Sequence, residues 1–301
     1  MPENWCIGFG FRGSCRQYNP RGQPNRLVAK TNSPLWAHGN FATNRQTMTD
    51  SSSLTGRAAL VTGAGVGIGR AIAESLAAAG AFVGLHCHRS LDGANEALAE
   101  IKRCGGDGIV LSADLSNDDE SQRLVDRFLE AAGRLDILVN NAGSPIERRK
   151  MEDCPLELWR RILDTNLTSA FVVTQRAIPH LKRSGHGAIV NNLSLSVQTG
   201  GANGAGPYAV AKGGLQVLTR TLARELAPDV RVNAIMPGVI ETRHHEVFTT
   251  AERMEQYRRE TPLGRNGTAE EVAAVVRFLV SDEARFVTGA LLDINGGRFL
   301  R

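Results

Sequence analysis

The sequence predicts an α/β fold built on a doubly wound, seven-stranded parallel sheet. From Arg57 onward, short apolar runs alternate with helical patterns. Most of these runs are uniformly apolar, which is typical of parallel strands covered by helices on both faces. The 301 residues are 42% apolar and 22% charged, an ordinary composition for a globular chain with one large core. Strands separated by helices imply right-handed βαβ units.

Each predicted element follows from its own pattern. Between the first two strands, Ile68, Ile72 and Leu76 recur at helical spacing, and Gly80 stands where a helix C-cap belongs. The helical pattern returns over residues 206–226 and 268–280. The expected strands are residues 58–62, 82–86, 108–112, 137–140, 188–193, 230–235 and 291–294. A ligand of such a sheet binds outside the carboxyl ends of the strands, where the strand order reverses.

Residues 1–53 are expected to be an N-terminal extension and residues 54–301 a single domain. The extension shows neither strand nor helix periodicity, and it lacks the apolar core of a secretory signal. We interpret it as disordered or as the product of a misassigned translation start, because the residues from Met48 read like a natural beginning. A chain that begins at Met48 is therefore expected to fold and to match the full chain in activity.

Charge and composition exclude several classes of function. Residues 1–47 carry six basic and one acidic side chain, and the remainder carries 29 basic and 30 acidic ones, so the net charge of +4 arises in the extension. The domain itself gives no reason to expect a nucleic-acid partner.

No apolar run approaches the length of a membrane span. The five cysteines are odd in number and form no Cys-x-x-Cys, which favours reduced thiols in the cytoplasm. The histidines lack further ligands at suitable spacing, so no metal site is expected.

A glycine-rich turn follows the first predicted strand. Gly63, Gly67 and Gly69 form the pattern T-G-x₃-G-x-G, and the strict G-x-G-x-x-G fingerprint is absent. Glycine after a strand permits a tight turn, and glycine at a helix start lets backbone N–H groups approach a pyrophosphate. Between a strand and a helix, this turn predicts a dinucleotide site in a Rossmann-like sheet, and it predicts no particular reaction.

Further motifs occur in order along the domain. They are Ala113-Asp114-Leu115, Asn140-Asn141-Ala142-Gly143, Tyr208-x-x-x-Lys212, Pro237-Gly238 and Asp293-Ile294-Asn295-Gly296-Gly297. With the glycine turn, this set resembles the short-chain dehydrogenase/reductase family over residues 54–298. The resemblance implies an NAD(P)-dependent oxidoreductase that moves a hydride between nicotinamide and a carbonyl or secondary alcohol carbon.

Tyr208 and Lys212 lie four residues apart on a predicted helix, so they share one face. A phenol is a poor base at neutral pH, and a nearby ammonium favours the phenolate, so we expect Lys212 to lower the pKa of Tyr208. By the resemblance, Tyr208 is the general acid or base and Lys212 also binds the nicotinamide ribose. Asn166 resembles the family asparagine that holds a water of the proton relay.

The serine that orients the substrate oxygen is less simply placed. In the family it usually precedes the tyrosine by 13 residues, and Leu195 occupies that position here. Alignment from the preceding strand favours Ser194, with one extra residue in the following Gly-rich loop, and leaves Ser196 as the second choice.

The resemblance also implies which residues contact the cofactor. They are Gly63, Gly67, Ile68, Gly69, Arg89, Asp114, Leu115, Asn141, Ala142, Gly143, Tyr208, Lys212, Pro237, Gly238 and Thr242. NADP(H) is favoured over NAD(H), because Cys87 occupies the position where NAD-preferring relatives carry an acidic residue. Arg89 follows closely and can pair with a 2′-phosphate, and Ser90 can add a hydroxyl. Val66 stands where NADP-dependent relatives often carry a second basic residue, so a preference is expected rather than exclusivity.

The substrate remains open among several classes. Residues 239–262 resemble the family's substrate lid, and their mixture of polar and aromatic side chains suits a 3-oxoacyl thioester, a sugar or polyol, or a small ketone. Two alternatives to a dehydrogenase are a non-catalytic nucleotide sensor and a sugar-nucleotide epimerase or dehydratase. The complete set of Ser194, Tyr208, Lys212 and Asn166 argues against the sensor. The three-residue gap after Gly63 and the short C-terminal region argue against the epimerase.

The resemblance further implies a homotetramer. In the family, the long helices that carry the asparagine and the tyrosine pack against their symmetry mates. The apolar residues Val217, Leu218 and Leu222 cannot be divided between core and interface from the sequence alone.

Overall fold

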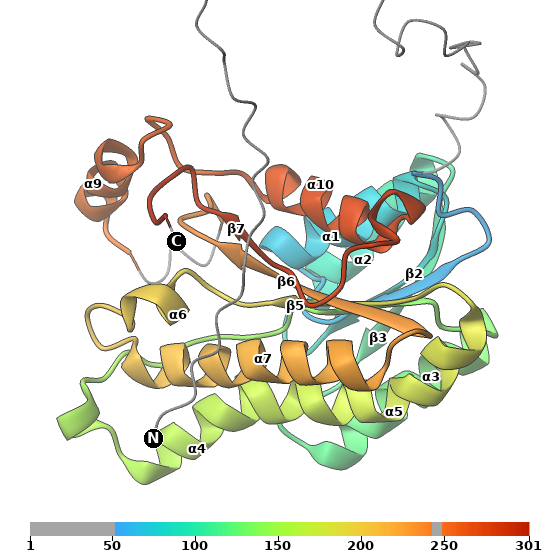
Figure 1. The fold of residues 1–301 in the computed structure, drawn as a ribbon, viewed down its shortest axis with the longest axis horizontal. Helices are drawn as coiled ribbons and strands as arrows, with labels where there is room; N and C mark the ends of the chain where they lie inside the picture. Colours follow the sequence, from blue (N-terminus) through green and yellow to red (C-terminus); the bar gives the residue numbers. More distant parts are fainter. Residues whose placement is uncertain (1–51, 243–248, 301) are drawn as a thin grey trace, which may run out of the picture. The chain divides into compact units, whose positions relative to one another are not determined.

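The domain contains a seven-stranded parallel sheet, as predicted. The computed structural model describes residues 52–242 and 249–300. Every pair of neighbouring strands is parallel, and their order is β3-β2-β1-β4-β5-β6-β7 (Figure 1). The strands are β1 (Ala58–Val61), β2 (Phe82–Cys87), β3 (Asp107–Ser112), β4 (Ile137–Asn140), β5 (Gly187–Asn192), β6 (Val230–Pro237) and β7 (Leu291–Ile294). The order reverses between β1 and β4, so the carboxyl ends of these two strands mark the expected ligand position.

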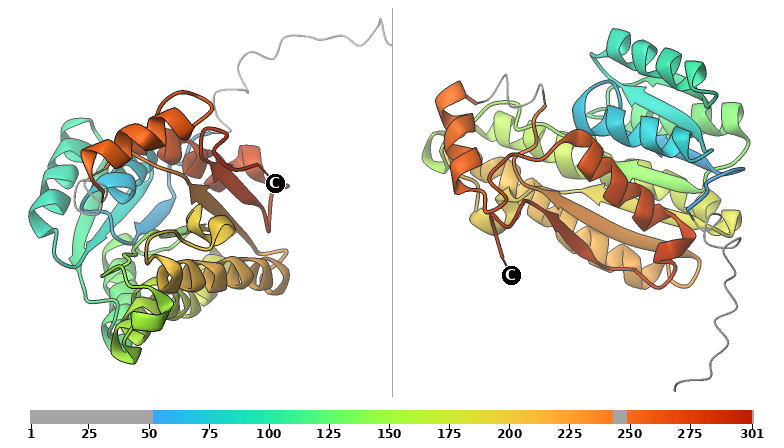
Figure 2. Two further views of the ribbon diagram at one scale, coloured as in Figure 1. Left: turned by 90° about the vertical axis from the view of Figure 1, so that its left-hand side faces the viewer. Right: turned by 90° about the horizontal axis from the view of Figure 1, so that it is seen from above.

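Helices cover both faces of the sheet (Figures 1 and 2). The helices α1 (Gly67–Ala78), α2 (Leu91–Arg103) and α10 (Ala269–Val280) share one apolar cluster with one face of the sheet. A second cluster joins the other face to α3 (Asp118–Ala132), α5 (Ser169–Ser184) and α7 (Gly206–Glu225). The remaining elements are α4 (Leu156–Leu163), α6 (Ser196–Thr199), α9 (Ala251–Glu260), η1 (Met151–Asp153), η2 (Asp164–Thr168) and η3 (Asp282–Ala284).

The element boundaries follow the sequence pattern closely. The strands β4 and β7 have the predicted bounds, and Gly80 adopts the positive φ of 99° expected after the end of α1. The strand β6 runs two residues past its predicted end, because its last residues pair with Asp293 and Ile294 of β7. Such pairing depends on a neighbour distant in sequence and leaves no local signal.

The predicted extension lies almost entirely outside the described residues. Within them, Leu54 is fully buried, and its N–H donates to Ala79 O, at the end of α1. Cys6 and Cys15 also lie outside. In the described part of the chain, no helix has the length and apolarity needed to cross a membrane.

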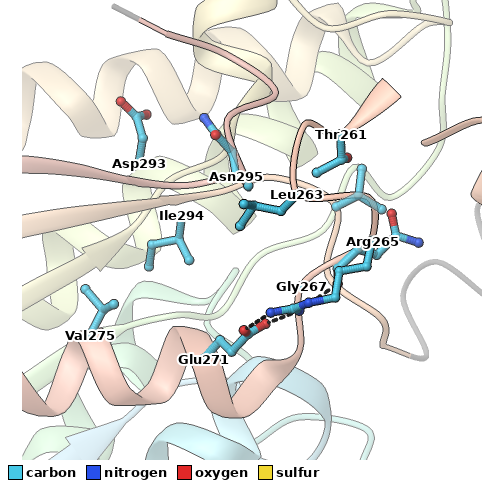
Figure 3. Close-up of a pocket in the computed structure, with 12 residues that line it drawn as sticks. Thr261, Leu263, Arg265, Gly267, Glu271, Val275, Asp293, Ile294 and Asn295 are labelled. Carbon is cyan, nitrogen blue, oxygen red and sulfur yellow. Dashed lines mark hydrogen bonds and ion pairs between the residues drawn. The ribbon is translucent and has the colours of Figure 1, made fainter. Parts of the chain in front are cut away.

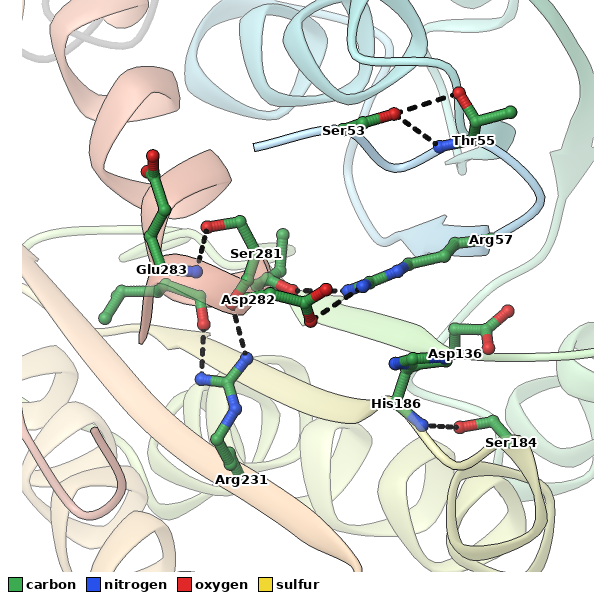
Figure 4. Close-up of polar contacts among 12 residues, drawn as sticks. Ser53, Thr55, Arg57, Asp136, Ser184, His186, Arg231, Ser281, Asp282 and Glu283 are labelled. Carbon is green, nitrogen blue, oxygen red and sulfur yellow. Dashed lines mark hydrogen bonds and ion pairs between the residues drawn. The ribbon is translucent and has the colours of Figure 1, made fainter. Parts of the chain in front are cut away.

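A polar cluster ties α10 to the amino ends of the central strands (Figure 4). Arg57 donates to Val280 O at 3.2 Å and to the Asp282 carboxylate at 2.7 Å. Arg231 donates to Leu279 O at 2.6 Å and to Ser281 O at 3.2 Å. Two guanidinium groups thus bind the free carbonyls at the C-terminus of α10, where positive charge is favourable. This cluster lies at the end of the sheet opposite to the motifs discussed above, so we assign it to stability.

Candidate active site

The glycine turn between β1 and α1 is tightly enclosed. Gly63 and Gly67 have φ values of 66° and 56°, which other residues adopt rarely. A Cβ on Gly63 would lie 2.9 Å from Ala142 Cα, and one on Gly69 would lie 2.2 Å from Gly63 O. The helix α1 begins at Gly67 with no side-chain cap and no acidic residue in its first turn. Its free N–H groups and positive dipole end therefore suit an anion such as the pyrophosphate of a dinucleotide.

The Asn140-Asn141-Ala142-Gly143 motif at the end of β4, the strand beside β1, binds the glycine turn through hydrogen bonds. Asn141 Nδ2 donates to Thr62 O at 2.9 Å and to Gly63 O at 3.0 Å. Thr62 Oγ1 in turn accepts from the backbone N–H groups of Asn141 and Ala142, both at 3.0 Å. The structure thus brings the predicted residues Gly63, Asn141 and Ala142 into one hydrogen-bonded unit.

Asn192, the last residue of β5, connects that unit to Lys212. Asn192 Nδ2 donates to Asn141 Oδ1 at 2.9 Å, and Lys212 Nζ donates to Asn192 O at 2.8 Å. Lys212 is only 2% exposed, so its ammonium depends on such contacts in place of water. Hydrogen bonds through Asn141 and Asn192 therefore connect the glycine turn to the predicted catalytic helix.

Tyr208 lies one turn before Lys212 on α7, as the spacing predicted. The Lys212 ammonium lies 5.8 Å from the centre of the Tyr208 ring. Of the two candidate serines, Ser194 is the one whose side chain acts on the pKa of Tyr208, which it lowers. Ser196 N donates to Ser194 Oγ at 3.1 Å, while the buried Ser196 Oγ has no hydrogen-bond partner in the described structure.

The pKa of Tyr208 departs from the expected direction in the protein alone. Burial raises it to about 12, and the hydrogen bond from Ser194 opposes this rise only in part. Burial also lowers the pKa of Lys212 to about 8. Desolvation of the phenolate thus dominates in the protein alone, and a lowered pKa of Tyr208 stays a prediction for the complex with the positively charged nicotinamide.

Asn166 lies in a π-helical turn, η2, between α4 and α5. The resemblance placed Asn166 on a long helix, and the π-helical turn is a local widening between two helices, of a kind frequent at functional sites. Its side chain is used fully: Oδ1 accepts from Ser144 N at 3.0 Å, and Nδ2 donates to Ser144 O and to Ile162 O. A Cβ on Gly143 would lie 2.6 Å from Asn166 Oδ1 and 2.9 Å from Lys212 Nζ. The glycine therefore lets both side chains approach the same point.

The carboxyl ends of β2 and β3 carry the residues predicted for the adenosine half of the cofactor. Cys87 is 1% exposed, and burial raises the pKa of its thiol, so the last residue of β2 carries no negative charge. Arg89 is exposed, and its positive charge acts on the Asp114 carboxylate, whose pKa it lowers. Asp114 lies 3.8 Å from His88, and its hydrogen bonds with Ser116 hold the pKa of this carboxyl below its usual value.

Three predicted contacts take forms that the sequence did not show. The Leu115 side chain is 8% exposed and packs in the apolar core, so only its backbone can face a cofactor. The Ile68 side chain likewise packs against the core. Ser90, expected beside a 2′-phosphate, lies against the glycine turn instead: a Cβ on Gly65 would come within 2.1 Å of its Oγ.

The predicted nicotinamide end of the site lies after β6. Gly238 N donates to Ile294 O at 2.9 Å, and a Cβ on Gly238 would lie 2.9 Å from Asn295 Cα. Thr242 lies 3.4 Å from the position of a Cβ on Gly67, so it faces the start of α1. The lid residues 243–248, with His244 and His245, lie outside the described residues.

A pocket of about 280 Å³ adjoins this segment, among the ends of β6 and β7 and the start of α10 (Figure 3). Arg265 and Glu271 form an ion pair at its edge, and Asn295 and Leu263 border it. Ser194, Tyr208, Lys212 and Asn166 do not line it, so we do not assign the chemistry to this pocket.

Sequence reasoning missed the polar residues inside the sheet. Asn140 Nδ2 donates to Asn191 Oδ1 at 2.8 Å, and Asn191 Nδ2 donates to Thr219 Oγ1 at 2.9 Å, which joins β4, β5 and α7 beneath the site. Asn192 was missed as well. The sequence did contain a signal for this network. An Asn–Asn pair stands at the end of each of two predicted strands that are otherwise apolar, and buried amides require hydrogen-bond partners.

Comparison with known proteins agrees with this geometry. The family described as enoyl-(acyl carrier protein) reductase matches residues 63–298. The chain is 38% identical to the 3-oxoacyl-[acyl-carrier-protein] reductase of Synechocystis sp. over 252 residues, 82% of this chain and 98% of the relative. It is 37% identical to glucose 1-dehydrogenase 2 of Bacillus subtilis over 248 residues, 82% of this chain and 96% of the relative.

Solved structures show the same similarity. A 7α-hydroxysteroid dehydrogenase in complex with NADH and 7-oxo glycochenodeoxycholic acid superposes with a TM-score of 0.79 at 33% identity, over 83% of this chain and 96% of that one. Complexes with NADP and with NADH both occur among similar structures. The chain therefore belongs to the short-chain dehydrogenase/reductase family and is an NAD(P)-dependent oxidoreductase that transfers a hydride between nicotinamide and a carbonyl or secondary alcohol carbon.

Proposed function

We propose that this enzyme interconverts a short polar carbonyl compound and its secondary alcohol, with Tyr208 as the proton donor and acceptor. The observation that carries the proposal is the position of Tyr208 beside the buried Lys212, whose ammonium lies 5.8 Å from the centre of the Tyr208 ring, with Ser194 lowering the pKa of the tyrosine. When bound, the nicotinamide supplies or accepts the hydride. Its binding by the glycine turn fits the close packing of Gly63 and Gly69, which leaves no room for side chains there.

The proton chemistry belongs to the protein. During reduction, the Tyr208 hydroxyl donates a proton to the carbonyl oxygen that receives negative charge, and Ser194 donates a hydrogen bond that orients this oxygen. During oxidation, the same tyrosine accepts the alcohol proton. Lys212 binds the nicotinamide ribose and stabilises the phenolate, an effect that must exceed the cost of burial described above. Asn166 holds the π-helical turn against Ser144, and we propose that it also holds a water of the proton relay, as the resemblance implies.

The described part of the lid supports a polar substrate. Six of the ten residues of α9 are charged, and none of the ten is buried. This favours a 3-oxoacyl thioester, or a sugar or polyol, over a long apolar substrate.

We further propose a preference for NADP(H), a tetrameric assembly and a cytoplasmic location. The first is supported by the buried Cys87 at the end of β2 and by the exposed Arg89 two residues later. The second is supported by exposed apolar side chains on α5 and α7, namely Phe171, Val210 and Val217. Residues 1–53 are proposed to be an extension that the domain does not need.

The substrate proposal is tested by the absorbance of reduced nicotinamide at 340 nm. A 3-oxoacyl thioester, a β-keto ester, hexoses, polyols, small ketones and a steroid ketone are assayed with both cofactors. We expect the highest kcat/KM with a thioester, sugar or polyol. The highest value for the steroid would contradict the proposal, and absence of turnover with every carbonyl and alcohol would contradict the catalytic assignment.

A further inference from the structure

His86 occupies a position from which it contacts both the glycine turn and Ala113, the residue that follows β3. It is the fifth residue of β2 and is only 2% exposed. Its Nδ1 lies 3.1 Å from Gly63 N, and its Nε2 lies 3.1 Å from Ala113 O. A backbone N–H can only donate and a backbone carbonyl can only accept, so Nε2 carries the proton and Nδ1 is the acceptor.

The backbone of His86 completes the same attachment. His86 O accepts from Ala64 N at 2.7 Å. The first two N–H groups of the turn, those of Gly63 and Ala64, therefore both donate to a single residue of the neighbouring strand. Asn141 holds the carbonyl side of the turn, through its contacts with Thr62 O and Gly63 O.

The remaining N–H groups, at the start of α1, have no side-chain cap. Their direction depends on the conformation of the turn that precedes them. A preorganised set of donors binds an anion more tightly than one that must be ordered on binding.

We propose that His86 is a positioning residue for dinucleotide binding, which holds the Gly63 turn in the conformation that presents the start of α1 to the pyrophosphate. The inference rests on the proposed binding of the dinucleotide at this turn. His86 itself touches neither cofactor nor substrate in this scheme, so its removal should weaken cofactor binding and leave the chemical step intact.

The electrostatic surroundings keep the required tautomer in place. Burial lowers the pKa of His86 to about 4, and the nearby charged groups are His88, which lowers it further, and Asp114, which opposes this effect. The ring is therefore neutral at neutral pH, and Nδ1 remains available as an acceptor for the Gly63 N–H.

The test compares two variants with a control. His86→Leu removes both ring hydrogen bonds, and His86→Asn retains one amide oxygen for the Gly63 N–H. Asn233→Leu is the control: this residue is 1% exposed and bridges β6 to Val287 O and Ala290 N, away from the turn. Affinities for NADPH and NADH are measured by titration of nicotinamide fluorescence. The kcat is measured at saturating cofactor, and the thermal midpoint of unfolding is measured without cofactor.

We expect His86→Leu to raise the Kd of both cofactors about tenfold and His86→Asn about threefold, because a buried N–H loses its acceptor fully or in part. The kcat at saturation should stay close to that of the unchanged enzyme. Asn233→Leu should lower the thermal midpoint and leave both Kd values unchanged. An unchanged Kd in His86→Leu, or a fall in kcat without a change in Kd, overturns the proposal.

Two further outcomes are informative. If His86→Leu does not fold, the Kd of His86→Asn decides, and a value equal to that of the unchanged enzyme overturns the proposal. If Asn233→Leu weakens cofactor binding as much as His86→Leu, the effect is general destabilisation and the proposal is likewise overturned. Failure of the unchanged enzyme to bind either cofactor would instead contradict the proposed function.

Discussion

Lys212 donates a hydrogen bond of 2.8 Å from its buried ammonium to the backbone carbonyl of Asn192. This contact joins α7 to the carboxyl end of β5, and the Asn192 side chain continues the connection to Asn141 beside the glycine turn. The relationship has a thermodynamic cost, because burial lowers the pKa of Lys212 to about 8. A charged lysine in this position opposes folding at neutral pH, and its retention is explained by function rather than by stability.

Lys212→Met is therefore expected to abolish turnover and to change how stability depends on pH. Between pH 8 and the ordinary lysine pKa of about 10.5, the unfolded chain binds a proton that the folded chain has lost. The free energy of unfolding of the unchanged enzyme should rise relative to that of the variant by about 3 kcal/mol across this window. Urea unfolding of both proteins at several pH values measures the difference. Curves that run parallel from pH 7 to pH 11 would show that Lys212 is not desolvated.

Tyr208→Phe should lower kcat by about 10³-fold while cofactor affinity stays nearly unchanged, because the substitution removes only the transferable proton. Turnover is followed at 340 nm, and binding is followed by fluorescence titration. Tyr257→Phe is the control, since it removes the same kind of hydroxyl from α9, where that hydroxyl accepts from Arg253. Retention of most of the original rate by Tyr208→Phe would refute the assignment of Tyr208.

The two serines that flank Leu195 form a matched pair. Ser194→Ala should lower kcat/KM about 10²-fold, because the donor that orients the substrate oxygen is lost. Ser196→Ala should leave it nearly unchanged, because the Ser196 hydroxyl is buried without a partner in the described structure. Steady-state kinetics of both variants, with the best substrate of the panel, decide between them. The opposite order of the two effects would move the role to Ser196.

Arg89→Ala should raise the KM for NADPH about tenfold and change the KM for NADH little, because one charge-assisted contact with the 2′-phosphate is lost. The control is Arg103→Ala, an exposed arginine of α2 that pairs with Glu100. Equal rises for both cofactors, or a preference of the unchanged enzyme for NADH, would show that the end of β2 does not select the phosphate.

Val217→Asp should convert a tetramer into a smaller species, as measured by light scattering at micromolar concentration. Val217 is 64% exposed on α7, and a charge in an apolar interface is costly. Leu91→Asp provides the control, because it adds the same charge at an exposed position on α2, which covers the other face of the sheet. A monomeric unchanged enzyme would contradict the assembly itself.

Much of this protein can be predicted from its sequence because the relevant signals are local. The apolar runs, the glycine turn and the four-residue spacing of Tyr208 and Lys212 each depend on neighbours in the chain. Strand–helix alternation then leaves few topologies, and the observed sheet is parallel, seven-stranded and doubly wound, as expected. The position of the site at the carboxyl ends of the strands follows from that topology.

Other features were decided only by the tertiary structure, because they depend on which groups from distant segments meet and on how much water they lose. The sequence could not assign three apolar residues of α7 to the core or to an interface. In the folded domain Leu222 is buried, Leu218 is partly buried and Val217 is exposed. The serine that acts on Tyr208, the attachment of His86 to Gly63 and the length of β6 all arise from contacts across the sheet. Local spacing brought a cation near Tyr208 and predicted a lowered pKa, but burial raised that pKa, since desolvation is a property of the folded environment and not of the intervening sequence.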